Sequence, residues 1–218
     1  METMNHRERV IGTVRFRPVD RLPCRHAYGL MPGVLERWHS EGLPTGVQTI
    51  SDQYAYFDFP PKPMPLPLQD AFDPPFESRV IEETDEYAVS IDGYNRKVKM
   101  LKRYASLPLP MEYPVRDEPT WRHYRDRLGF HSGRVGPNLE TVAAENIARG
   151  HLNAFNLTGF YWFPRNLLGD EALCVAYYET PDLVRNILET YCGLVEKLLE
   201  AVLGRVRLDV VHVGEDMA

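Results

Sequence analysis

The feature that most constrains the fold is a long apolar stripe followed by a short valine-rich run near the end of the sequence. Thr180, Pro181 and Asp182 supply a helix cap, a first-turn proline and a first-turn acid. Apolar residues then recur at steps of one, three and four positions, which keeps them on one helix face for about six turns. They are Leu183, Val184, Ile187, Leu188, Tyr191, Leu194, Val195, Leu198, Leu199 and Val202. Gly204 ends this helix, and the run from Leu208 to Val213 predicts a buried parallel strand.

A second buried strand is predicted on the N-terminal side of this helix, from His151 to Leu157. It follows a helix expected from Asn138 to Ala148, which Gly150 ends. The order of strand, helix and strand is typical of a βαβ unit, in which the two strands are parallel. The sequence therefore predicts an α/β fold built on a parallel sheet or barrel.

The N-terminal third predicts short helices. Asn5, with Glu8 three residues later, forms a capping-box pattern that opens a helix with Val10, Ile11 and Val14 on one face. Further helices are expected at residues 32–41, 47–57 and 119–128, and a short strand at residues 24–27.

The central part of the sequence predicts an extended loop and then an antiparallel hairpin. Seven prolines between Pro60 and Pro75 exclude a regular helix or a central strand, while the apolar residues among them indicate packing. Apolar and polar residues then alternate on both sides of Asp92 and Gly93, which is a strong hairpin signal. We expect residues 76–103 to form a hairpin inserted into the α/β domain.

Composition limits the classes of function. The net charge of −6 and the lack of a basic stripe argue against nucleic-acid binding. The sequence has no apolar run of membrane-spanning length, and three widely spaced cysteines without a CxxC pair indicate free thiols in a reducing, cytoplasmic compartment. The histidines have no metal-ligand spacing, so we expect no metal site within this chain.

Two adjacent acids follow the last predicted strand. Glu215 and Asp216 lie where α/β enzymes place their catalytic groups, just beyond the carboxyl end of a parallel strand. We interpret them as candidate catalytic residues, able to act as an acid, a base or a hydrogen-bond acceptor. The structural alternative is that one of these carboxylates caps the next helix, which we expect to lie beyond this chain.

Two further groups are candidates for substrate binding. Arg25 offers a planar fork suited to carboxylates, and His26 titrates near neutral pH. Tyr161, Trp162 and Arg165 belong to an aromatic cluster with a single cation, which suits a flat organic ligand with acidic substituents. A salt bridge at Arg25 and an aromatic core at the second group are the alternatives.

Four segments also carry a resemblance to a known family. They are residues 5–14 with 18–23, residues 160–169, the helix that begins at Pro181, and residues 212–218. In this order they resemble the uroporphyrinogen decarboxylase superfamily. The resemblance implies a (β/α)8 TIM-type barrel domain over residues 1–218, present only as its N-terminal half and therefore incomplete.

The resemblance implies one of two chemistries. One branch decarboxylates acetate side chains of the tetrapyrrole uroporphyrinogen III in porphyrin biosynthesis, without a cofactor. The other branch transfers methyl groups between methyl donors and corrinoid or thiol acceptors with zinc, whose ligands would lie outside this chain. Arg25 matches the first of two signature arginines, but Gly29 stands at the second position. Leu167 replaces a tyrosine, Asp216 replaces a serine, and Asp58 is the nearest candidate for a substrate-binding aspartate.

The sequence thus predicts a carboxy-lyase that resembles uroporphyrinogen decarboxylase, with a methyltransferase of the same superfamily or a non-catalytic binding protein as alternatives. A half-barrel exposes strand edges and apolar helix faces. We therefore expect residues 1–218 alone to be inactive and to associate, with a homodimer among the expected forms.

Overall fold

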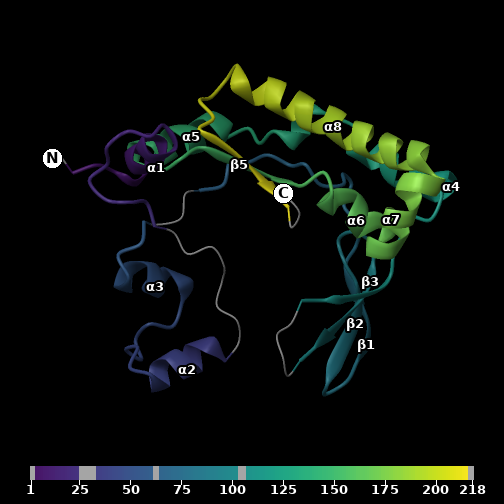
Figure 1. Ribbon diagram of the computed structural model, residues 1–218, viewed down its shortest axis with the longest axis horizontal. Coiled ribbons are helices and arrows are strands. Elements are labelled where there is room, and N and C mark those ends of the chain that lie inside the picture. The colour runs from purple at the N-terminus through teal and green to yellow at the C-terminus, as the bar shows by residue number, and fades with distance from the viewer. Residues whose placement is uncertain (1–2, 25–32, 61–63, 103–106, 216–218) are drawn as a thin grey trace. The chain divides into compact units, whose positions relative to one another are not determined.

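The computed structural model describes residues 3–24, 33–60, 64–102 and 107–215 of this mixed α/β protein (Figure 1). The chain divides into two compact units. The first comprises Met1–Leu66 and Thr141–Asn153, and the second comprises Pro67–Glu140 and Ala154–Ala218.

The first unit contains short helices whose starts are fixed by side-chain caps. In α1 (His6–Val14), Asn5 Oδ1 accepts from the Glu8 amide at 2.9 Å while Glu8 Oε2 accepts from the Asn5 amide at 2.8 Å, which confirms the predicted capping box. Helix α2 spans Val34–Ser40, and α3 (Ile50–Tyr56) begins with a second capping box between Thr49 and Asp52.

Glycine has a structural role around α1. Gly12 is the buried position of this helix, and a methyl group there would overlap Val19. The apolar stripe predicted for this helix is wrong at Val14, whose side chain is exposed, because the helix packs through Gly12. Gly150 follows α5 (Leu139–Ala148) with a positive φ of 70°, and its carbonyl accepts a hydrogen bond from the Arg7 amide.

The second unit contains a four-stranded antiparallel sheet in the order β1-β2-β3-β4. Its strands are β1 (Arg79–Glu83), β2 (Tyr87–Ile91), β3 (Lys97–Leu101) and β4 (Leu109–Glu112). The predicted hairpin is the β2–β3 pair, and Asp92 Oδ1 holds its turn by accepting from the amides of Tyr94 and Arg96. The expected two-stranded insertion is thus part of a larger sheet, because β1 and β4 add to its edges.

A buried arginine fixes part of the proline-rich segment in the second unit. The Arg134 guanidinium donates to the carbonyl oxygens of Gln69 and Ala71 in that segment, and to those of Arg127 and Gly129. Residues 64–75 form no helix or named strand, as the prolines predict, apart from an isolated bridge between Leu68 and Val135. Arg134 therefore satisfies backbone groups that a loop of this kind would otherwise leave unpaired.

The remainder of the second unit contains the βαβ unit that the sequence predicts. After α4 (Glu118–Arg125) come β5 (Ala154–Thr158), α6 (Trp162–Leu168), α7 (Asp170–Glu179), α8 (Pro181–Leu203) and β6 (Val210–Gly214). Figure 1 shows β5 and β6 side by side, and they pair in parallel from Ala154 with Val210 to Thr158 with Gly214. Short 3-10 turns cover Asp126–Leu128 and Ser132–Arg134.

Helix α8 buries the predicted stripe, although its start differs from the expectation. Eight of the stripe residues are buried: Leu183, Val184, Ile187, Tyr191, Leu194, Val195, Leu198 and Val202. Thr180 occupies the N-cap position, but its side chain accepts no hydrogen bond from the helix, so the side-chain cap predicted there is wrong. From the neighbouring α4, the Trp121 indole N–H donates to Asn186 Oδ1 at 2.7 Å.

The last strand is parallel, as predicted, but it is not buried. Val211 and Val213 are 40% and 42% exposed. Among the described residues β6 pairs with β5 alone, so one edge of the strand has no neighbour in the sheet. The described strands form a four-stranded antiparallel sheet and a parallel pair, and they do not show the incomplete (β/α)8 barrel that the resemblance implies. No helix within the described part of the chain is long and apolar enough to cross a membrane.

Candidate functional site

The carboxyl ends of β5 and β6 bring together residues that are more than fifty positions apart in the sequence. Thr158 and Gly214 end the two strands as register partners, and the Gly159 amide donates to the Gly214 carbonyl oxygen at 2.9 Å. The loop from Thr158 to Tyr161 then leads into α6. Because ligands of parallel sheets bind at this edge, the loop is the natural centre of a candidate site.

Glu215 lies against this loop. Its Oε1 accepts from the Tyr161 amide at 2.6 Å and its Oε2 from the Trp162 amide at 3.1 Å, so both oxygens bind the start of α6. Gly159 permits this approach, since a Cβ atom at that position would overlap the Glu215 carboxyl group. The structure thus gives Glu215 the helix-capping role that the sequence left as the alternative, although the helix is α6 and not a later one. Asp216 lies outside the described residues.

The aromatic cluster after β5 divides between core and surface. Phe163 is buried and stacks on Tyr191, with ring centroids 4.2 Å apart and planes 7° apart. Tyr161 and Trp162 are half-buried, and burial raises the pKa of the Tyr161 hydroxyl. Arg165 Nε lies 2.6 Å from Asp170 Oδ1 and its guanidinium lies over the Trp162 ring. A substrate carboxylate at Arg165 would therefore compete with Asp170.

A carboxylate that the sequence analysis missed lies at the same strand end. Asp70 Oδ2 accepts a hydrogen bond from the Tyr191 hydroxyl at 2.6 Å and another from the Thr158 amide at 3.1 Å. The Tyr191 hydroxyl also lies 3.0 Å from the Thr158 carbonyl oxygen. Burial, followed by the negative charge of Asp70, raises the pKa of Tyr191, so this hydroxyl remains a hydrogen-bond donor.

The hairpin turn supplies a second set of polar groups to this region. Arg96 pairs with Asp92, and its Nη1 donates to Asn166 Oδ1 on α6. The Tyr94 hydroxyl lies 3.5 Å from Thr158 Oγ1, and burial raises the pKa of Tyr94. Asn166 Nδ2 is buried, and among the described residues it has no hydrogen-bond partner. The turn and the start of α6 are thus linked by polar contacts beside the Asp70 carboxylate.

Sequence signals for Asp70 are weak. It lies within the proline-rich segment, which has no periodicity, and its two donors come from residues far along the chain. Tyr191 lies on an apolar helix stripe, where a tyrosine hydroxyl needs a polar partner once it is buried. That requirement was the one available signal, and it does not say which residue supplies the partner.

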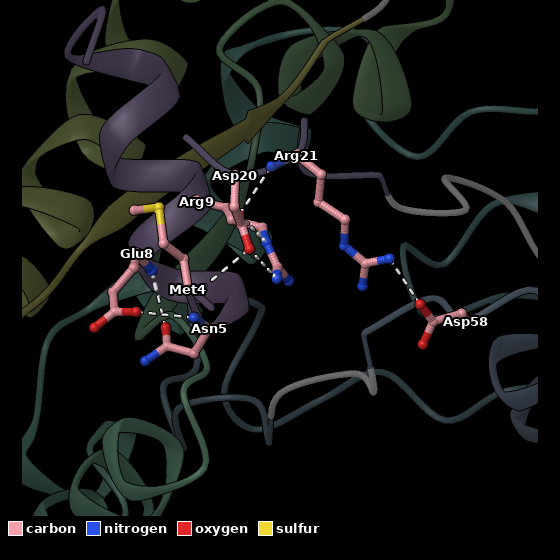
Figure 2. A network of polar contacts seen from close by, with 7 residues as sticks. All are labelled: Met4, Asn5, Glu8, Arg9, Asp20, Arg21 and Asp58. Atoms are coloured by element: carbon pink, nitrogen blue, oxygen red, sulfur yellow. Dashed lines mark hydrogen bonds and ion pairs between the residues drawn. The ribbon is translucent and has the colours of Figure 1, made fainter. Parts of the chain in front are cut away.

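The remaining predicted substrate residues belong to the segment after Cys24. Arg25 and His26 lie outside the described residues, and Cys24 is exposed. The chain just before them is fixed by a polar network in the first unit (Figure 2). There Arg9 binds both oxygens of Asp20, and Arg21 pairs with Asp58. Asp58, the nearest candidate for the family's substrate-binding aspartate, is thus an ion-pair partner.

Within the described residues, no group of three or more His, Cys, Asp or Glu side chains could hold a metal ion. Comparison with known proteins adds no relative: no protein-family model, curated protein or solved structure matches this chain. Membership of the uroporphyrinogen decarboxylase superfamily therefore stays a prediction from the sequence.

Proposed function

We propose that this protein is a carboxy-lyase that resembles uroporphyrinogen decarboxylase and binds a tetrapyrrole at the carboxyl ends of β5 and β6. The observation that carries the proposal is the Asp70 carboxylate at that edge, held through one oxygen by Tyr191 and Thr158. Both of these hydrogen bonds fall on Oδ2, and in this proposal Oδ1 accepts from a donor of the ligand. Pyrrole N–H groups are donors of this kind.

The contacts around Asp70 hold its carboxylate in place as a hydrogen-bond acceptor. Tyr191 is fully buried and stacks on Phe163, so its hydroxyl has little freedom to move away from Asp70. The raised pKa of Tyr191 keeps this hydroxyl protonated and makes it a poor proton donor for chemistry. Asp70 and Tyr191 would therefore orient the substrate, and they would not exchange protons with it.

Decarboxylation of an acetate side chain breaks its carbon–carboxylate bond and releases CO2. The electron pair remains on the methylene carbon, which becomes a methyl group when it takes up a proton. In this proposal the proton comes from a group other than Asp70 and Tyr191. Of the two sequence-predicted catalytic acids, Glu215 binds the start of α6, so Asp216 is the candidate. Arg25 would hold a substrate carboxylate through its planar fork.

The test measures turnover in the wild-type protein and in a variant that removes the charge of Asp70 but keeps the size of its side chain. The complete gene product is incubated anaerobically with uroporphyrinogen III, and carboxylated products are separated after oxidation and detected by fluorescence. We expect coproporphyrinogen to form, and Asp70→Asn to lower both tetrapyrrole binding and turnover by about ten-fold, which corresponds to one charged hydrogen bond.

Asp85→Asn is the control, because Asp85 is an exposed acid at the turn between β1 and β2. It should leave binding and turnover unchanged. A complete protein that neither binds nor decarboxylates the tetrapyrrole would refute the proposal. Equal effects of Asp70→Asn and Asp85→Asn would refute only the part of the proposal that concerns Asp70.

A further inference from the structure

The first unit contains a pocket of about 300 Å³ between the segments 21–24 and 57–60. Its apolar lining includes Leu22, Pro23, Phe57, Phe59 and Pro60. Its polar lining includes Arg9, Arg21 and Asp58, which Figure 2 draws together with their partners. A volume of this size is at the lower end of the range for small-molecule sites, roughly 300–1,000 Å³.

One of the two arginines is fixed and neutralised. Arg9 Nε and Nη2 donate to the two oxygens of Asp20 at 2.7 and 2.8 Å, and Asp20 also accepts from the amides of Met4 and Arg21. The side chains of Arg9 and Asp20 are 12% and 18% exposed. A ligand could displace Asp20 only by breaking four hydrogen bonds, so Arg9 serves as a fixed wall of the pocket.

The second arginine is held much more weakly. Arg21 Nη1 donates to Asp58 Oδ2 at 2.7 Å, and the two side chains are 54% and 82% exposed. An ion pair in such contact with water contributes little to stability, because solvent screens the two charges. Asp58 also has a positive φ of 52°, a conformation that Asp and Asn tolerate better than most residues. The Arg21–Asp58 pair can therefore open at little cost.

We propose that this pocket binds a small organic carboxylate, which replaces Asp58 on Arg21 and places its apolar body against Phe57 and Phe59. A free carboxylate can bind both arms of a guanidinium, whereas Asp58 makes one hydrogen bond to Arg21. The released Asp58 carboxylate returns to water, where most of its surface already lies. The exchange thus adds a hydrogen bond and buries apolar surface of the ligand.

The electrostatic surroundings support an anion at this position. The Asp20 hydrogen bond is the largest cause of the raised pKa of Arg9, and the charge of Asp58 adds to it. Because Asp20 already neutralises Arg9, the attraction that a ligand carboxylate would experience at the place of Asp58 comes mainly from Arg21. All of these residues belong to the first unit, so the inference does not depend on the tetrapyrrole proposal.

The test uses benzoate, with benzamide as a neutral ligand of the same shape, titrated against the full chain by calorimetry. We expect benzoate to bind at least about ten-fold more tightly than benzamide, the difference expected of a charged hydrogen-bonded pair. Arg21→Gln should remove this preference. Asp58→Asn should strengthen benzoate binding, because the competing carboxylate is lost and Asn tolerates the same backbone conformation.

The control is Arg185→Gln, which removes an exposed arginine in a similar ion pair, with Nη1 2.8 Å from Asp182 Oδ1. It should leave benzoate affinity unchanged, which separates local from overall charge effects. Opposite effects of Arg21→Gln and Asp58→Asn support the proposal, since loss of the salt bridge alone would move both variants in the same direction. Equal affinity for benzoate and benzamide, or effects of the same sign in the two variants, would overturn it.

Discussion

The hydrogen bond between Tyr191 and Asp70 can be removed without disturbing the aromatic packing around it. Tyr191→Phe deletes the hydroxyl but keeps the ring, which is fully buried and stacks on Phe163 at 4.2 Å. The variant leaves Asp70 Oδ2 with the Thr158 amide as its described donor. Any loss of stability therefore measures the hydroxyl alone.

The expected loss in the free energy of unfolding is about 2 kcal/mol, because hydrogen bonds to charged groups contribute about 1.5–3 kcal/mol. Urea denaturation followed by tryptophan fluorescence measures it, since the buried Trp121 reports on the same unit. Tyr87→Phe is a matched control. Its hydroxyl also lies 2.6 Å from a carboxylate oxygen, that of Glu82, but the pair is exposed, so we expect a loss below about 0.5 kcal/mol.

The Tyr191 hydroxyl also predicts that the free energy of unfolding depends on pH in the alkaline range. The pKa of Tyr191 is raised in the folded protein by burial and by Asp70, whereas an unfolded tyrosine titrates with a pKa of about 10. Below that pH both the folded and the unfolded protein keep the Tyr191 proton, and the hydrogen bond to Asp70 contributes its full stabilisation. Above it the unfolded state loses the proton first, so the advantage of wild type over Tyr191→Phe shrinks by up to about 1.4 kcal/mol per pH unit. Equal losses in Tyr191→Phe and Tyr87→Phe, or an advantage that grows above pH 10, would refute this reasoning.

Four further substitutions test the packing and the caps, each by urea denaturation. Gly159→Ala should cost about 1–3 kcal/mol, because its methyl group would overlap Glu215. Gly193→Ala on α8 is the contrasting variant. It should stabilise the protein by up to about 1 kcal/mol, since nothing lies within 4 Å of the added atom. Arg134→Met should cost about 3 kcal/mol, because the carbonyl oxygens that the guanidinium binds lose their donors; a neutral result would contradict that role. Asn5→Ala should cost about 1 kcal/mol through loss of the α1 cap, and an unchanged midpoint would show that the cap contributes nothing.

The sequence predicted the parts of this protein that depend on neighbouring residues. The capping box at Asn5 and the hairpin turn at Asp92 are confirmed because their hydrogen bonds join residues two to four positions apart. The stripe on α8 is confirmed because helix periodicity fixes which side chains share a face. The parallel pairing of β5 and β6 followed from the same logic, since a helix between two strands returns the chain in the same direction.

Only the tertiary structure decided what the polar groups contact. The sequence indicated that Glu215 lies at a strand end, but its partners are amides more than fifty residues earlier, and they make it a helix cap. Asp70 meets a hydroxyl 121 residues away, and Arg134 binds carbonyl oxygens up to 65 residues away. Local periodicity contains no information about such pairs. They exist because packing brings distant segments together and because buried polar groups must then find partners wherever the fold places them.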